Sequence, residues 1–242
     1  MSKQQPAKRR GRSNKVMVFT CVLALIGAVI VGAIINNATA GKRFQGEIET
    51  INKVFSTSKN DNIEQVLGRT VSSGNYAKVE KSLKSYLLDL YHNITEIDEL
   101  ADNEAVYSAL EGAYLAKNRD NLNTTVTELD KAEKQLKTLS DQYKVLYNEE
   151  GVMTYISQQN LNEEFTSLFK DNARVFYEDE KVKNNYESML KLLKSSIAVE
   201  KEAVDFLNNH KSSWEIKNNQ LKFSDTSVSK KYDKILEKVA DL

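Results

Sequence analysis

"LAKNRDNLNTTVTELDKAEKQLKTLSDQYKVL", residues 115–146, is the stretch that decides the expected fold. A leucine or tyrosine recurs at every seventh position: Leu115, Leu122, Leu129, Leu136 and Tyr143. A second set fills the companion position of each repeat: Asn118, Thr125, Ala132, Leu139 and Leu146. Residues at this spacing share one face of an α-helix. The stretch therefore predicts one continuous, coiled-coil-like helix of about 32 residues, roughly 50 Å long. Its apolar seam would face either the chain's own helices or a partner.

Further helical stripes lie on both sides of this stretch. Apolar residues at steps of three and four run from residue 76 to residue 101, and "ADN" (101–103) then offers a break with an N-cap at Asp102 or Asn103. Gly151 predicts the next turn, because glycine can adopt the positive φ that ends a helix. Helical spacing returns after it, over residues 161–176, 190–207 (interrupted by Glu200) and 228–242.

The composition agrees with long helices. The only proline is Pro6, and no glycine follows Gly151, so the two residues that most often break helices are missing from the second half of the body. The expected fold is all-α, an elongated antiparallel bundle of three or four long helices.

One short segment departs from the helical pattern. "SWEIKNNQLKF", residues 213–223, alternates apolar and polar side chains on either side of Asn218-Asn219, which is typical of a tight β-hairpin. A two-residue loop there pairs Ile216 with Leu221, Glu215 with Lys222, and Trp214 with Phe223. The four apolar residues of the hairpin then share one face and are the candidate partner-binding residues: Trp214, Ile216, Leu221 and Phe223.

The N-terminal region predicts a membrane span. Val16 to Ile35 contains no charged residue and, at 1.5 Å per residue, is long enough to cross a bilayer core of about 30 Å. Six of the 34 basic residues and none of the 34 acidic ones lie within the first 40 residues. The positive-inside rule then places the N-terminus in the cytoplasm and the body outside.

Two interpretations of this run stay open. Its length favours an uncleaved signal anchor, whereas Ala38-Thr39-Ala40 fits the pattern of a signal-peptide cleavage site after Ala40. A lipoprotein acylated at Cys21 does not fit, because no small residue precedes that cysteine. Ala24, Ala28 and Gly32 have the spacing that lets two transmembrane helices pack closely, so they are the candidate residues for self-association into a homo-oligomer.

The expected domain layout follows from these segments. It comprises a basic cytoplasmic tail (1–15), a transmembrane helix acting as signal anchor (16–35), a juxtamembrane helix and loops (36–75) and an extracytoplasmic helical bundle (76–242). Within the third segment, Phe44, Ile48, Ile51 and Phe55 have the spacing of a short amphipathic helix.

The sequence offers little that indicates catalysis. Asp89, His92 and Glu96 could share one helical face, but a di-iron bundle needs a second carboxylate–histidine pair, which His210 lacks. The single cysteine lies in the apolar run, and no phosphate-binding loop or nucleophile motif is present in the sequence. We therefore expect no enzyme activity, no metal and no cofactor.

The leading hypothesis is a bacterial single-pass protein of the plasma membrane that binds protein partners or cell-envelope components outside the cytoplasm. The alternative is a secreted, adhesin-like or host-directed helical factor released after Ala40. A body with a net charge of −6 after the first 40 residues argues against nucleic acid as the partner.

Overall fold

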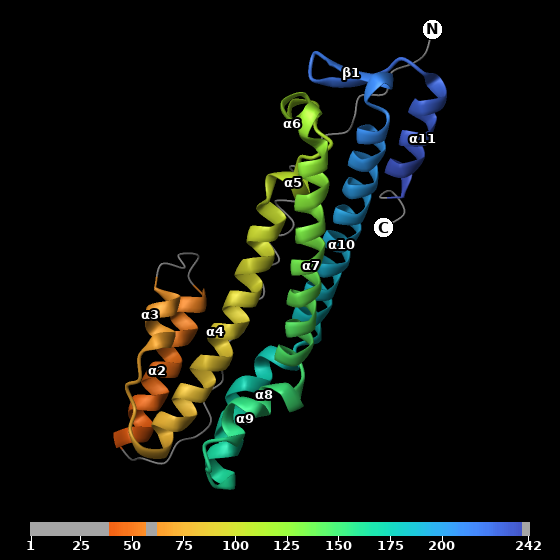
Figure 1. Ribbon diagram of the computed structural model, residues 1–242. Helices are drawn as coiled ribbons and strands as arrows, with labels where there is room; N and C mark the ends of the chain where they lie inside the picture. The colour runs from red at the N-terminus through yellow and green to blue at the C-terminus, as the bar shows by residue number, and fades with distance from the viewer. Residues whose placement is uncertain (1–38, 57–61, 239–242) are drawn as a thin grey trace. The chain divides into compact units, whose positions relative to one another are not determined.

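Helices account for most of the described chain, which comprises residues 39–56 and 62–238 of the computed structural model (Figure 1). The α-helices are α2 (Thr39–Ser56), α3 (Ile63–Gly68), α4 (Gly74–Asp102), α5 (Glu104–Tyr107), α6 (Gly112–Asn118), α7 (Leu122–Leu146), α8 (Glu149–Ser157), α9 (Glu163–Tyr177), α10 (Glu180–Asn209) and α11 (Thr226–Glu237). Two 3₁₀ turns, η1 (Arg119–Asn121) and η2 (Lys211–Ser213), and two strands, β1 (Trp214–Lys217) and β2 (Gln220–Phe223), complete these elements.

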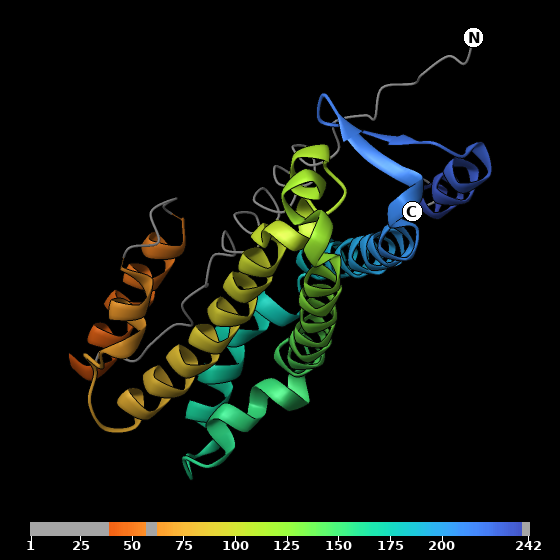
Figure 2. The ribbon, with the colours of Figure 1, turned by 45° about the horizontal axis from the view of Figure 1, so that its top comes forward.

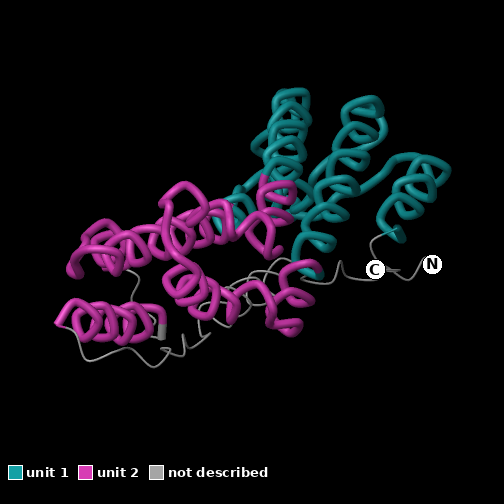
Figure 3. The backbone as a smooth tube through the Cα atoms, turned by 90° about the horizontal axis from the view of Figure 1, so that it is seen from below, with its two compact units in different colours: residues 1–19, 97–138, 188–242 teal, residues 20–96, 139–187 magenta. Residues whose placement is uncertain are grey.

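The chain divides into two compact units, coloured separately in Figure 3. Within the described residues, unit 1 holds residues 97–138 and 188–238, and unit 2 holds residues 39–56, 62–96 and 139–187. The division falls inside α4, α7 and α10, so each of these helices contributes residues to both units.

The core of unit 2 is rich in aromatic side chains. The apolar face of α2 is buried, as its sequence spacing predicts, through Phe44, Ile48 and Ile51. Tyr86 of α4 lies edge-on to Phe176 of α9, with ring centroids 6.2 Å apart. Such edge-to-face packing is favourable for aromatic rings, and it joins the α4 and α9 faces of this unit.

Unit 1 is built from aliphatic stripes together with the hairpin. Leu122 and Leu129 of α7 and Ile197 and Leu207 of α10 are fully buried.

Asn103 caps α5 by accepting a hydrogen bond from the backbone N–H of Ala105, so the predicted break after residue 101 is confirmed.

The predicted β-hairpin is confirmed in its register. β1 and β2 are antiparallel, and Trp214 pairs with Phe223, Glu215 with Lys222 and Ile216 with Leu221. Figure 2 shows the two strands following the end of α10. Asn218 and Asn219 have φ values of 53° and 57°, the left-handed conformation that a two-residue type I′ turn requires and that asparagine tolerates.

The prediction of one helix over residues 115–146 is wrong in its continuity. α6 ends at Asn118, and η1 separates it from α7, which begins at Leu122. Asn118 donates a side-chain hydrogen bond to the carbonyl of Tyr114, and Asp120 and Asn121 follow. Short polar side chains of this kind compete with the helical hydrogen bonds. The leucines of the heptad are nevertheless buried within the chain.

The predicted role of Gly151 is also wrong. The chain turns earlier, at Tyr147 and Asn148, and Gly151 lies in the first turn of α8, where its N–H donates to the side chain of Asn148. A Cβ at Gly151 would lie 2.3 Å from the carbonyl oxygen of Val145, so glycine is needed there for space.

The predicted membrane span lies outside the described residues, together with Ala24, Ala28 and Gly32. Within the described ranges, none of the helices combines the length and hydropathy that crossing a bilayer requires. The amphipathic pattern of the C-terminal segment is observed as α11, and residues 239–242 likewise lie outside the description.

A pair of glycine substitutions tests whether the hairpin turn packs closely against Gly112. A Cβ at Gly112 would lie 1.9 Å from the carbonyl oxygen of Asn219, so Gly112→Ala must displace the hairpin turn. We expect it to lower the free energy of unfolding by about 1–3 kcal/mol, as overpacking usually does. Gly46→Ala, at an exposed helical position with nothing within 4 Å, should instead raise it by about 0.5–1 kcal/mol. Urea unfolding of both variants measures the difference, and equal effects would contradict the close contact.

Candidate functional site

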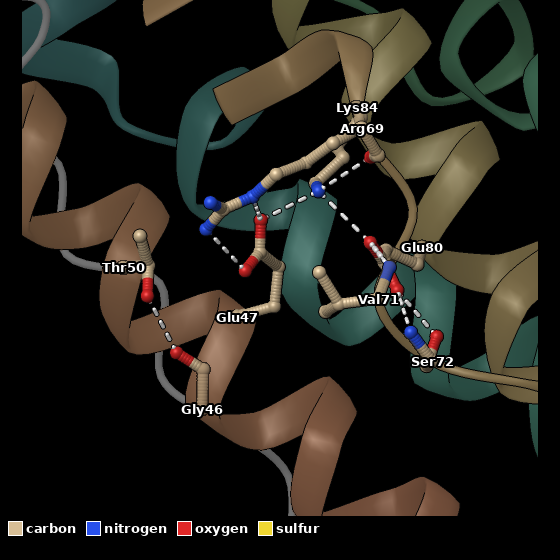
Figure 4. A network of polar contacts seen from close by, with 8 residues as sticks. All are labelled: Gly46, Glu47, Thr50, Arg69, Val71, Ser72, Glu80 and Lys84. Carbon is tan, nitrogen blue, oxygen red and sulfur yellow. Dashed lines mark hydrogen bonds and ion pairs between the residues drawn. The ribbon is translucent and has the colours of Figure 1, made fainter. Parts of the chain in front are cut away.

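The most extensive polar site that the structure describes is a buried ion network in unit 2, formed by Glu47, Arg69, Glu80 and Lys84 (Figure 4). Lys84 Nζ donates to Glu47 Oε1 at 2.6 Å, to Glu80 Oε1 at 2.8 Å and to the backbone carbonyl of Arg69 at 2.8 Å. A lysine ammonium has three N–H donors, so all of them are satisfied.

The four carboxylate oxygens of the network all accept hydrogen bonds. Arg69 holds the Glu47 carboxylate with two parallel hydrogen bonds, from Nε at 3.0 Å and from Nη2 at 2.9 Å. Glu80 accepts the backbone N–H of Val71 at 2.9 Å and that of Ser72 at 2.8 Å, together with the Ser72 hydroxyl. Each carboxylate therefore has a cation and further donors around it.

Burial makes these contacts energetically important. The side chains of Glu47, Glu80 and Lys84 are 4%, 1% and 2% exposed, whereas Arg69 is 47% exposed and reaches solvent. Burial alone would raise the pKa of Glu80, but the hydrogen bonds from Lys84, Ser72 and Val71 outweigh it and lower that pKa. The network has no net formal charge. It joins α2, the α3–α4 connection and α4 into one structure.

Sequence reasoning missed this network. Glu47 lies on the apolar face of α2 between Phe44 and Ile48, and Glu80 and Lys84 lie four residues apart within the apolar stripe of α4. A charge on an otherwise apolar face is the available signal, because such a side chain is buried unless the helix turns it outward. The separations of 37 residues between Glu47 and Lys84 and 22 between Glu47 and Arg69 leave no local pattern to find.

Tyrosines form a second buried group in unit 2. The rings of Tyr143 and Tyr186 are stacked with centroids 4.1 Å apart, and Tyr147 lies against both. Tyr86 donates its hydroxyl to the carbonyl of Leu146 at 3.1 Å. Burial raises the pKa of each of these four tyrosines, so they stay protonated near neutral pH and act as core residues with a polar end.

The histidine considered for metal binding makes other contacts. His92 Nε2 lies 3.4 Å from Glu64 Oε1 on the surface, and Asp89 accepts a hydrogen bond from the Tyr155 hydroxyl at 2.6 Å. Over the described ranges, no cluster of three or more histidine, cysteine or acidic side chains has the arrangement of a metal site.

The hairpin residues fall into two groups. Trp214 is 2% exposed, donates its indole N–H to the carbonyl of Leu207 at 2.8 Å and packs under the guanidinium of Arg119, 5.0 Å from the ring centroid. Its three companions, Ile216, Leu221 and Phe223, are only partly buried. Trp214 thus anchors the hairpin to its own unit, and the companions keep surface that a partner could contact.

Arg119 attaches the hairpin to η1 through side-chain hydrogen bonds. Its Nη2 donates to the carbonyl of Lys211 at 2.9 Å and to that of Trp214 at 3.1 Å. These bonds occupy a backbone acceptor of β1 and tie the strand to η1. Sequence reasoning identified the hairpin but did not find its attachment, because residue 119 is distant in the chain.

Unit 1 contains one unusual carboxylate, Glu200 on α10. Although part of its side chain stays exposed, its Oε2 is covered and has no hydrogen-bond partner among the described residues. Burial, with a further contribution from the negative charge of Glu111, raises the pKa of Glu200 from 4.5 to about 9. The carboxyl group is therefore protonated at neutral pH. Its position on the apolar stripe is visible in the sequence, but its protonation state is not.

Comparisons with protein-family models, curated proteins and solved structures give no match to this chain.

Removing the central cation tests the ion network. Lys84→Met leaves two buried carboxylates without their shared ammonium, and breaking such a buried pair should cost about 3–5 kcal/mol of unfolding free energy. The matched control is Lys170→Met, which removes a 2.5 Å pair with Glu149 whose partners are 42% and 50% exposed. That change should cost less than about 1 kcal/mol. Chemical denaturation measures both, and similar losses would contradict the burial of the two carboxylates around Lys84.

The raised pKa of Glu200 has a defined effect on stability. The group ionises near pH 4.5 in the unfolded chain and near pH 9 in the folded one, so its stabilising contribution is full below about pH 4.5 and is lost as pH rises toward 9. Glu200→Gln should therefore raise the unfolding free energy at about pH 8 by at least about 1 kcal/mol, and by nearly nothing at about pH 4. The control Glu202→Gln, at a carboxylate that is 46% exposed and paired with Lys238, should not raise the unfolding free energy at about pH 8. A stability gain from Glu200→Gln that is the same at both pH values would refute the burial of a neutral carboxyl group.

Proposed function

We propose that this chain is a single-pass, membrane-anchored protein whose helical body binds protein partners or cell-envelope components without catalysing a reaction. The apolar run Val16–Ile35, preceded by six basic residues, supplies the anchor. α2 begins at Thr39, so the body starts almost directly after the span.

The main observation in favour of an uncleaved anchor is the position of the Ala40–Gly41 bond. This bond lies inside α2, and Gly41 is buried. Cleavage would leave the cationic amino group of Gly41 at the N-terminal end of a helix, beside Lys42 and Arg43 and with no acidic residue in the first turn. A positive charge at that end opposes the helix dipole. An uncleaved chain avoids this cost, which supports the anchor over the released form.

The arrangement of the buried charged side chains supports a binding role. The buried charges of unit 2 are held in hydrogen bonds to one another, so they join helices and are not presented to a substrate. The hairpin of unit 1 presents Ile216 and Leu221 at its surface while Trp214 fixes it from below. Ile216 and Leu221 lie on the same face of the hairpin as Trp214, and we assign partner contact to the part of this face that stays exposed.

The secreted alternative rests on the Ala38-Thr39-Ala40 cleavage pattern and predicts a shorter chain that begins at Gly41. Expression of the full chain in a bacterial host, followed by alkaline carbonate extraction and intact-mass analysis, separates the two. We expect an unprocessed chain in the membrane pellet, and we expect Leu25→Arg to move it out of the pellet, because an arginine at the centre of a span costs about 2.5–3.5 kcal/mol. A soluble chain that begins at Gly41 would refute the anchor.

The same membranes test the binding role. A photo-crosslinking residue at position 216 or 221 should give defined adducts, and one at Lys131, an exposed position of α7 in the same unit, should not. Equal adduct patterns at all three positions would refute the hairpin as the contact surface.

A further inference from the structure

Three parts of unit 2 meet at one end: the first two turns of α2, the first turn of α4, and the α8–α9 connection (residues 158–162) with the first turn of α9. The rings of Phe44 and Tyr76 lie 6.0 Å apart, and those of Tyr76 and Phe165 lie 5.0 Å apart. Lys78 Nζ donates to the carbonyl of Gln159 at 3.2 Å. Figures 1 and 2 both show the start of α2 and the start of α4 at this end, which we call the α2–α4 end.

The side chains at the α2–α4 end have the character of a membrane–water interface. Lys42, Arg43 and Lys78 are exposed, and Tyr76 and Leu161 are partly exposed. Tyrosine is enriched where one end of a side chain is apolar and the other wet, and lysine and arginine place their charge among headgroups while their stems cover apolar surface.

The acidic residues of this end lie to one side of it. Glu163 and Glu164 are exposed in the first turn of α9, whereas the first turn of α2 contains no acidic residue. Anionic headgroups would repel the α9 side and attract the α2 side. A contact with such a surface is therefore centred on Lys42 and Arg43.

The chain length between the proposed span and α2 keeps this end close to the bilayer. Residues 36–38 separate Ile35 from Thr39, so the link covers at most about 14 Å even when fully extended. Lys42 and Arg43 lie about 5 Å further along the helix. The headgroup layer is roughly 5–7 Å thick on each side of the hydrocarbon core. Because about 14 Å is an upper limit, a link that is not fully extended brings Lys42 and Arg43 within side-chain reach of this layer.

The ion network holds α2 in a fixed rotation within the unit. Glu47 follows Arg43 by one helical turn and is bound to Lys84 of α4. Turning α2 about its axis would pull Glu47 away from a buried cation, which is costly. The basic first turn therefore keeps its place on the surface of unit 2.

We propose that the α2–α4 end of unit 2 rests on the surface of an anionic phospholipid bilayer, with Lys42 and Arg43 binding the headgroup phosphates and Tyr76 lying at the interface. This inference rests on the proposed membrane anchor. It adds a second attachment, since the tether sets the distance of the body from the bilayer and the basic turn sets which end of unit 2 faces it.

The test uses the full chain, with Cys21→Ser, reconstituted in vesicles of phosphatidylcholine with or without phosphatidylglycerol. A fluorophore is attached through Asn75→Cys in the first turn of α4, or through Glu96→Cys, about 30 Å away along the same helix. Lipids with a nitroxide on the headgroup quench a fluorophore that lies near the surface. We expect strong quenching at position 75 and weak quenching at position 96.

The charge dependence is tested with Lys42→Gln/Arg43→Gln and the matched control Lys230→Gln/Lys231→Gln on α11 of unit 1. Each basic residue near an anionic surface shifts a contact equilibrium by about five-fold. The first pair should therefore reduce quenching at position 75 by about two-fold or more in the anionic vesicles only, and the control pair should leave it unchanged. Equal quenching at positions 75 and 96, or equal effects of the two charge pairs, overturns the contact while the anchor stands. Loss of the unmodified chain from the vesicles in an alkaline wash refutes the anchor and this contact together.

Discussion

The ammonium group of Lys84 is the constraint on which unit 2 depends. A lysine that is 2% exposed is tolerated only when its three donors are satisfied, and Glu47, Glu80 and the Arg69 carbonyl supply the three acceptors. These acceptors come from three different segments of the chain. An apolar contact between α2 and α4 could slide along the helices, whereas a buried ion pair is satisfied in one register only. We regard this specificity as the main role of the network, because buried ion pairs often contribute little net stability compared with well-packed apolar residues.

The parts of the fold that could be predicted from the sequence are those set by local chemistry. The hairpin register follows from the alternation around Asn218-Asn219 and the left-handed conformation that asparagine accepts. The break near residue 103 follows from a side chain that caps the next helix. The apolar stripe of α2 follows from spacing alone.

The features that escaped prediction depend on three-dimensional contacts or on a balance between competing local effects. The heptad over residues 115–146 describes which side chains are buried but not that Asn118 and its polar neighbours interrupt the helix. Gly151 signals a turn in the sequence, yet the nearby Val145 carbonyl is what requires it. Arg69 and Glu47 are 22 residues apart, and no periodicity links them. Hairpin attachment by Arg119 is hidden for the same reason.

The proposed anchor and the ion network act on the same helix. Any force that a membrane tether transmits to the body enters through the first turn of α2, and Glu47 lies about two turns further along the helix. The network then passes that load to α4, whose residues 74–96 belong to unit 2. In unit 1, Trp214 and Arg119 hold the proposed partner-contact surface. Attachment to the membrane is therefore assigned to unit 2, and recognition of a partner to unit 1.

The placement of the aromatic residues gives the two units separate optical signals. The only tryptophan of the chain is buried in unit 1 beneath a guanidinium group, and most of the eleven tyrosines, including the stacked pair Tyr143 and Tyr186, belong to unit 2. Indole emission excited at long wavelength therefore reports the environment of unit 1 alone, while the near-ultraviolet circular dichroism of the tyrosines is dominated by unit 2. Spectroscopy of the unmodified protein can thus follow each unit independently as the chain unfolds, binds or meets a membrane.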